Sequence, residues 1–187
     1  MTELQKMLAG EEFNSLDLEL RLLREQARLA CGKYNAHPSK GNFKHVRRLF
    51  NEVSSAVIEP GFQCDYGCHI NIGENFYANF NCVMLDSAFI HIGDDVLLGP
   101  GVHIYTVDHP RQANLRREGG CFATSVSIGN GIKFQPSVPG HNRGGGCSQA
   151  LNPIGFYAEI IKTRHPFHCV TGAIESNLLA QLFDFTV

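Results

Sequence analysis

His109 is the residue whose type and context most clearly suggest chemistry. It stands in "VDHP", before a proline and ahead of the basic stretch "RQANLRR", where it interrupts a regular apolar repeat. An imidazole changes its charge close to neutral pH, so it can act as an acid or a base there. Pro110 restricts the histidine backbone to extended conformations, which helps to aim the ring. A surface or packing role is the alternative for an isolated histidine.

The cysteines raise a second possibility, a metal or thiol site. Cys64, Cys68 and His69 lie close together in the sequence, and Cys121 and Cys147 could form another pair. Neither group contains a Cys-x-x-Cys pair or a second pair at zinc-ribbon spacing, so we expect no metal site. The sequence also lacks a local signature of a histidine-activated nucleophilic cysteine.

The composition is that of a soluble globular protein. The chain has 187 residues and a formal net charge of −2, which gives no general reason to expect a nucleic-acid or membrane-surface partner. Seven cysteines at irregular spacings fit reduced thiols better than a disulfide framework. The start of the chain is acidic, and no apolar run reaches signal-peptide or transmembrane length. We therefore expect a cytoplasmic protein.

Residues 1–55 are predicted to be helical. In "LDLELRLLREQARLACGKYN" apolar residues recur at about helical spacing: Leu16, Leu20, Leu23, Ala27 and Ala30. "HPSKGN" predicts a break, and "FKHVRRLFNEV" predicts a second short amphipathic helix. The basic residues of this segment, among them Arg24 and Arg28, are expected to face solvent, or in one or two cases to reach a phosphate-bearing ligand.

From Ile58 onward the dominant pattern is a six-residue apolar repeat. Apolar residues, often followed by glycine, stand six apart in two runs: Ile72, Ala78, Met84 and Ile92, Leu98, Ile104. A two-residue offset near "LDSAFI" predicts a bulge or turn, and Ile128 lies a further four sixes beyond Ile104. This period is wrong for a helix and for a half-buried strand. It is typical of a parallel β-helix, in which short strands stack coil upon coil.

Two segments resemble a known family. "MLAGEEF" and "IEPGFQCDYGCHINIGENFYANFNCVMLDSAFIHIGDDVLLGPGVHIYTVDHP" closely resemble the maltose/galactoside O-acetyltransferases and nodulation-type acetyltransferases, a match that covers about residues 1–130. These are hexapeptide-repeat acyltransferases. The resemblance implies a mainly β fold, with an N-terminal helical segment over 1–55 and a left-handed parallel β-helix over 56–130. It also implies a homotrimer, and an extended loop over 107–125 that folds over a neighbouring subunit.

The resemblance implies direct transfer of an acetyl group from acetyl-CoA to a hydroxyl of a sugar or related small molecule. His109 falls on the family's catalytic histidine and would take the hydroxyl proton as general base. Asn79, in "YANFNCV", matches the asparagine beside the reacting centre, where an amide can donate to the oxyanion or hold the acceptor hydroxyl. A structural turn residue is the alternative for Asn79.

Further implied contacts concern the acceptor. Asp65, in "CDYG", matches a position that lines the sugar pocket, although an ordinary turn aspartate is an equal alternative. Asp86 and Ser87, in "MLDS", lie near another implied substrate contact, and the sequence does not decide which of the two makes it. The family's acidic contact near the N-terminus aligns with Ser15, and Asp17 lies nearby.

After Asn130 the sequence departs from the family pattern. Residues 131–187 show no six-residue repeat, and the chain contains no tryptophan, where the family would continue with further coils. "GHNRGGGCS" predicts a flexible link, and "AIESNLLAQLFDF" predicts a terminal helix. Because the family builds its coenzyme A cleft largely from those later coils, no cofactor-binding residue can be assigned. An inactive or truncated paralogue that acts through binding or assembly is one alternative, and a β-helical metalloenzyme is another.

Overall fold

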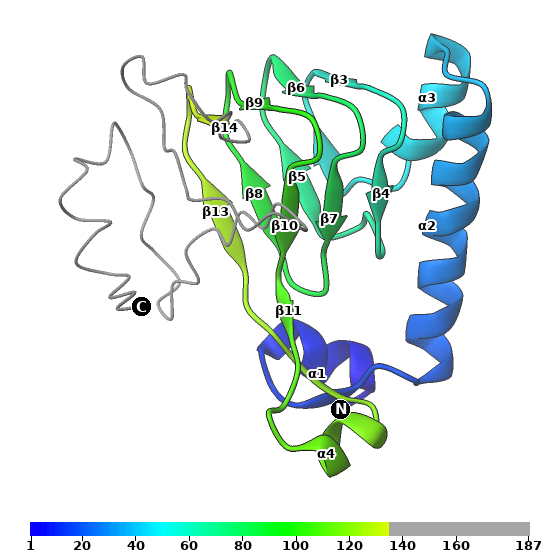
Figure 1. Cartoon of the computed structure of the whole chain (residues 1–187), viewed down its shortest axis with the longest axis vertical. Helices are drawn as coiled ribbons and strands as arrows, with labels where there is room; N and C mark the ends of the chain where they lie inside the picture. Colours follow the sequence, from blue (N-terminus) through cyan, green and yellow to red (C-terminus); the bar gives the residue numbers. More distant parts are fainter. Residues whose placement is uncertain (135–187) are drawn as a thin grey trace, which may run out of the picture.

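A computed structural model of the chain describes residues 1–134. Three parallel sheets wrap this part of the chain into successive coils (Figure 1). Sheet 1 has the strand order β13-β8-β5-β2, sheet 2 the order β14-β9-β6-β3 and sheet 3 the order β10-β7-β4. Each coil contributes one strand to each sheet, so the molecule is a parallel β-helix. The predicted link and terminal helix of the segment 131–187 lie outside the described residues.

The strands are two or three residues long, which suits the short sides of such a coil. The first two coils contain β2 Glu52–Val53, β3 Ala56–Ile58, β4 Gln63–Cys64, β5 Ile70–Ile72, β6 Phe76–Ala78 and β7 Val83–Leu85. The third coil and the beginning of a fourth contain β8 Ile90–Ile92, β9 Leu97–Leu98, β10 His103–Tyr105, β13 Val126–Ile128 and β14 Lys133–Phe134. The first coil thus begins a few residues before position 56.

The six-residue repeat marks the side chains that point into the coils. Ile72, Ile92 and Ile128 are paired in succession across sheet 1. In the same way Ala78 pairs with Leu98 in sheet 2, and Met84 pairs with Ile104 in sheet 3. All of these residues are buried in one hydrophobic cluster, which confirms the predicted parallel β-helix. Burial of such side chains by stacking is the main source of stability in a repeat of this kind.

The glycine after the inward isoleucine makes room for the next coil. A Cβ added at Gly93 would lie 2.2 Å from Oδ1 of Asn130. That oxygen accepts a hydrogen bond from the backbone N–H of Asp94 at 2.9 Å. One coil earlier, a Cβ at Gly73 would lie 2.4 Å from Oδ1 of Asp94. The recurring Ile-Gly pair therefore reflects close approach between coils at this corner.

The two-residue offset near "LDSAFI" is the corner between sheet 3 and sheet 1. Between β7 and β8 the chain turns through buried Asp86, Ser87 and Ala88. The hydroxyl of Thr106, from the next coil, accepts from the Ala88 N–H at 2.8 Å and donates to the Leu85 carbonyl at 2.8 Å. The predicted turn is confirmed. A connection of similar length joins β4 to β5, so this type of corner occurs in more than one coil.

The segment between Ile104 and Ile128 does not contain four more repeats, although its length fits that number. It leaves the coils as an arm made of β11 Val107–Asp108, α4 Ala113–Arg117 and β12 Gly120–Ala123. In this arm β12 lies between β11 and β1 (Phe13–Asn14), with antiparallel pairing on both sides. The arm packs on the N-terminal segment of its own chain, beside α1 (Figure 1). That the loop 107–125 also covers a neighbouring subunit stays a prediction.

The N-terminal segment is helical with a break, as predicted. Its helices are α1 Glu3–Ala9, α2 Leu18–Ala36 and α3 Lys40–Arg47. The Asp17 carboxylate caps α2 by accepting from two backbone N–H groups of the first turn. Leu16, predicted on the apolar face, lies before this cap and is exposed. The Tyr34 hydroxyl of α2 donates to the Ile58 carbonyl, which fixes the helix on the first coil. Among residues 1–134, no helix has the length and apolarity required to cross a bilayer.

Candidate functional site

The predicted site residues fall on two different edges of the coils. Asp65, Asp86 and Ser87 occupy the corner between sheet 3 and sheet 1, and His109 lies on the arm that leaves this corner. Asn79 instead follows β6, at the corner between sheet 2 and sheet 3. Figure 1 shows β6 along the upper edge of the coils and β11 leaving the lower edge. Within residues 1–134, no hydrogen bond joins Asn79 to His109.

His109 is exposed, and one of its ring nitrogens is anchored. Its Nδ1 lies 3.3 Å from Sγ of Cys121, a residue in the middle strand of the arm that is 1% exposed. Its backbone N–H donates to the Asp108 carboxylate at 2.7 Å. In the described part of the chain Nε2 has no hydrogen-bond partner. The imidazole therefore offers one free nitrogen to a molecule outside the chain.

The side chain of Asn79 is poised to act as a donor. Its Oδ1 accepts a hydrogen bond from the Phe80 N–H at 2.8 Å, and its backbone N–H donates to the Leu98 carbonyl at 2.9 Å. Because the local backbone occupies the amide oxygen, the Nδ2 group is left to donate. A fixed amide donor of this kind is suited to stabilise a developing oxyanion.

Asp65 belongs to a polar cluster built from three segments. Burial raises the pKa of the Asp65 carboxyl, while the charges of Arg24 and Arg28 act in the opposite direction. The Arg24 guanidinium donates to the Tyr66 hydroxyl at 2.6 Å and to the Ser15 carbonyl at 2.5 Å. The sequence placed Arg24 on a basic helix face and did not connect it with Asp65. This connection depends on how α2 packs against β4.

Ser15 and Asp17 have different positions relative to this cluster. The Ser15 hydroxyl donates to the Gly119 carbonyl at 3.1 Å, and so links the N-terminal segment to the arm. Asp17 is used as the N-cap of α2. Of the two residues near the expected acidic contact, Ser15 is therefore the one beside Arg24 and the arm.

Asp86 holds the corner of the coil together, and Ser87 is buried beside it. Asp86 is 0% exposed, and its carboxyl oxygens accept from the backbone N–H groups of Tyr66 at 2.8 Å and His69 at 3.3 Å. Burial is the main cause that raises the pKa of Asp86 to about 7, against the opposing effect of these donors. Neither side chain presents appreciable surface to a bound acceptor in this chain.

The described cysteines of the two candidate metal clusters contact other cysteines or histidines. The Sγ atoms of Cys31 and Cys64 are 3.8 Å apart, and Sγ of Cys68 lies 3.5 Å from Nε2 of His69. Within residues 1–134, no three His, Cys, Asp or Glu side chains are grouped so that they could hold a metal ion. Cys147 lies outside the described residues.

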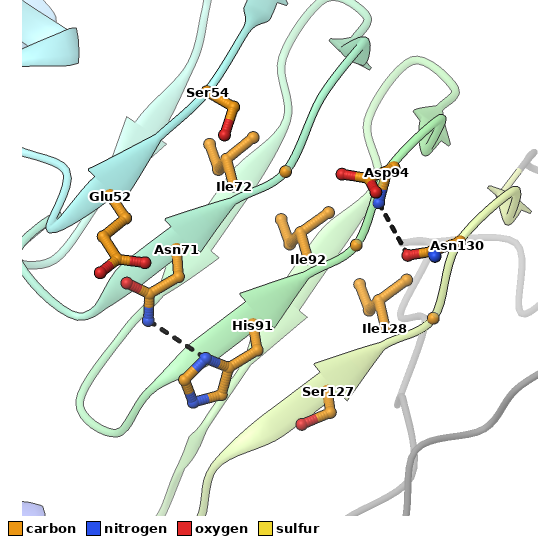
Figure 2. A pocket seen from close by; sticks show the side chains of 13 residues that line it. Glu52, Ser54, Asn71, Ile72, His91, Ile92, Asp94, Ser127, Ile128 and Asn130 are labelled. Carbon is orange, nitrogen blue, oxygen red and sulfur yellow. Dashed lines mark hydrogen bonds between the residues drawn. The ribbon is translucent and has the colours of Figure 1, made fainter.

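A shallow hollow of about 490 Å³ lies on the outer face of sheet 1 (Figure 2). Its lining includes Asn71, His91 and Ser127 from successive strands. The polar groups there bond to one another: Nδ2 of Asn71 lies 3.1 Å from Nδ1 of His91. None of the predicted site residues lines this hollow, so it is separate from the histidine-bearing arm.

The stacked triangular coils, with an Ile-Gly corner and an arm that carries an exposed histidine, define a hexapeptide-repeat β-helix protein. Residues 6–53 match the maltose acetyltransferase hexapeptide capping motif. Nodulation protein L of Rhizobium meliloti (strain 1021) is 41% identical over 137 residues, which cover 70% of this chain and 74% of that protein. The chain belongs to the maltose/galactoside O-acetyltransferase family of hexapeptide-repeat acyltransferases.

Solved structures of acetyltransferases have the same architecture. A maltose O-acetyltransferase from Clostridium difficile 630 is 36% identical with a TM-score of 0.64, and the match covers 71% of this chain and 76% of that one. A hexapeptide-repeat acetyltransferase from Vibrio cholerae, complexed with acetyl coenzyme A, is 32% identical with a TM-score of 0.58, over 71% of this chain and 80% of that one. The β-helix of the family is left-handed, as predicted. The matches cover about 70% of this chain, which agrees with a resemblance predicted to span about residues 1–130.

Proposed function

We propose that this protein transfers an acetyl group from acetyl-CoA to a hydroxyl group of a sugar or related small molecule. Family membership supports the reaction, and the related Vibrio cholerae enzyme was solved with acetyl coenzyme A. The observation that carries the proposal is the state of His109. Its ring is exposed and anchored through Nδ1, and Nε2 is free in the described part of the chain. This is the arrangement that a general base requires.

The proposed reaction is a direct transfer with no acyl-enzyme. Nε2 of His109 accepts the proton of the acceptor hydroxyl while the hydroxyl oxygen attacks the thioester carbonyl. Nδ2 of Asn79 donates to the oxyanion that forms on the carbonyl oxygen. The intermediate then expels the coenzyme A thiolate, which takes the proton back from the imidazolium. The products are the acetyl ester and coenzyme A.

Asp65 is the proposed contact with the acceptor. Its half-buried carboxylate lies next to the Arg24–Tyr66 pair, on the edge of the coils from which the arm leaves. A carboxylate can accept hydrogen bonds from two hydroxyl groups of a sugar. Asp86 contributes indirectly in this proposal, because its carboxyl accepts from the Tyr66 N–H and so fixes the corner in which Ser87 is also buried.

The two edges of the coils point to a site shared between chains. Asn79 follows β6 and His109 follows β11, at different corners of the coils, and within residues 1–134 no hydrogen bond joins them, so in this proposal the two residues of one site come from two subunits. The outer face of sheet 2 also exposes Val57 (56%) and Leu97 (44%), apolar surface that a second copy would cover. We propose a cyclic homotrimer with three equivalent sites.

A mixing experiment tests this arrangement. His109→Ala and Asn79→Asp chains, each inactive alone, are unfolded together and refolded. A shared site predicts that activity returns in the mixture, since some interfaces then combine an intact His109 with an intact Asn79. Light scattering should give the mass of a trimer. A monomer at micromolar concentration, or a mixture that stays inactive, would contradict the shared site.

The reaction itself is tested with the full chain, acetyl-CoA and a panel of sugars. Release of the coenzyme A thiol that depends on an added acceptor is the expected result. If no acceptor supports release, while the chain still assembles, the protein is an inactive paralogue that acts through binding or assembly.

We further propose that the protein works in the cytoplasm. The cysteines described by the structure are all free thiols: Cys31, Cys64, Cys68, Cys82 and Cys121. Free buried thiols are typical of proteins kept in a reducing compartment. Cell fractionation checks this, and recovery of the protein from a secreted fraction would contradict it.

A further inference from the structure

The contact between Cys121 and His109 joins a buried thiol to the exposed ring of the proposed base. Sγ of Cys121 and Nδ1 of His109 are 3.3 Å apart, within the range of a hydrogen bond to sulfur. Cys121 is the partner of Phe13 on β1, and its neighbour Phe122 is the partner of Asp108 on β11. Because strands flank β12 on both sides, the sulfur is held in place before any substrate binds.

This contact bears directly on which ring nitrogen carries the proton. A neutral imidazole has one N–H and one lone pair, so a base that works through Nε2 must keep its proton on Nδ1. After Nε2 takes a proton, Nδ1 can only donate. A sulfur lone pair next to Nδ1 can accept that hydrogen both before and after the transfer, although it is a weak acceptor.

We propose that Cys121 is a positioning residue, which holds the proton of neutral His109 on Nδ1 and so leaves Nε2 free to act as the base. The inference rests on the proposed function, because it assigns a role to a partner of the proposed base. Cys121 itself gains neither a proton nor an acetyl group in the reaction.

The burial of Cys121 decides against the obvious rival role. A cysteine in contact with a histidine is also the usual arrangement of an activated nucleophile. Cys121 is 1% exposed and packs in a hydrophobic cluster with Met7, Phe13 and Leu20. A thioester cannot approach a sulfur enclosed in this way. The thiol therefore acts on the imidazole and not on the acetyl group.

The test reads the tautomer of His109 directly. The full chain is labelled with ¹⁵N-histidine, and the His109 signals are assigned by their loss in His109→Gln. In the parent protein the neutral ring should carry its proton on Nδ1. In Cys121→Ala the partner of Nδ1 is gone, so the Nε2–H form should increase, and Cys121→Ser should restore the parental form. Cys82→Ala is the matched control, since it removes a buried thiol whose contact is the Gly99 carbonyl.

Kinetics complete the experiment. Cys121→Ala should lower kcat on the order of tenfold, the effect of one weak hydrogen bond, with the KM of both substrates unchanged. Unchanged His109 signals in Cys121→Ala, or a parent ring with its proton on Nε2, would overturn the proposal. A gain of one acetyl group on Cys121, detected by mass spectrometry after mixing with acetyl-CoA, would overturn it in favour of the nucleophile. If His109→Gln keeps full activity, the proposed function fails, while the tautomer measurement still reports on Cys121.

Discussion

Oδ1 of Asn130 accepts a hydrogen bond from the backbone N–H of Asp94, one coil away along sheet 1 (Figure 2). This bond is possible because Gly93 has no side chain in the space that the Asn130 amide occupies. The fourth coil therefore begins in register with the third, at the point where the sequence departs from the family pattern.

Gly93→Ala should destabilise the protein. The added Cβ would lie 2.2 Å from Oδ1 of Asn130 and 3.0 Å from its backbone nitrogen, so the Asn130 amide must leave the Asp94 N–H and the backbone of the next coil must shift slightly. Overpacking of this kind costs about 1–3 kcal/mol, which urea unfolding would detect. Gly32→Ala is the control, and it should change the free energy of unfolding in the opposite direction. Gly32 lies inside α2 with no atom within 4 Å of an added Cβ, so alanine there should stabilise by about 0.5–1 kcal/mol. Equal stability of the two variants would contradict this account of the Ile-Gly corner.

His109→Ala should remove most acetyl transfer and leave the fold intact. Loss of a general base lowers the rate by about 10²–10⁴, and an exposed loop substitution changes stability by only about 0.5 kcal/mol. Binding of acetyl-CoA should change much less, since the base contacts the acceptor hydroxyl.

The control for His109 is another exposed histidine. His37, the C-cap of α2, has no part in the proposed reaction, so His37→Ala should retain parental rates. A well-folded His109→Ala protein with parental kcat on the best acceptor would show that His109 is not the base.

Asn79→Asp should lower kcat strongly and leave the fold intact. The new side chain keeps an oxygen for the Phe80 N–H but replaces the Nδ2 donor with a second oxygen, which repels the oxyanion. Loss of one such donor lowers kcat by about 10²–10³. Asn51→Asp, an exposed change on the outer face of sheet 1, is the matched control and should leave kcat unchanged. Equal rates for Asn79→Asp and the parent would remove Asn79 from the proposed reaction.

Asp86 should make the stability depend on pH in a defined direction. Burial raises its pKa from the ordinary 3.8 to about 7, so the folded state holds this proton more tightly than the unfolded state. The stabilisation is complete below the unfolded pKa and is lost as the pH rises towards about 7. Relative to Asp86→Asn, which does not titrate, the parent should lose on the order of 1–4 kcal/mol over this range. Urea unfolding at several pH values measures the difference, and a constant difference would contradict the raised pKa.

The coils could be predicted from the sequence because each inward position is fixed by the backbone. Ile72, Ile92 and Leu98 recur because each occupies the same place in its coil, where the alternation of the short strand turns the side chain into the core. The distance from Ile104 to Ile128 also fitted that period, but only by coincidence. A spacing alone does not distinguish four repeats from an arm that leaves the coils and returns.

The partners of the site residues could not be predicted in the same way. The contact of His109 with Cys121 depends on the register of β12 against β11, and the contact of Arg24 with Tyr66 depends on where α2 lies on the first coil. Neither contact can be read from the local sequence around these residues. The alternation in "GCFA", which places Cys121 on the inner side of β12, is the one signal that could have suggested a buried partner.

The pairing of β1 with β12 makes the first residues of the chain part of the scaffold of the proposed base. Phe13 is paired with Cys121, and the Ser15 N–H and hydroxyl both bond to the Gly119 carbonyl. Removal of this segment would turn β12 into an open edge strand, with backbone groups ready to pair with another chain. An affinity tag should therefore be separated from Met1 by a spacer, because a bulky group against β1 would disturb the pairing of β1 with β12 and with it the arm that carries His109.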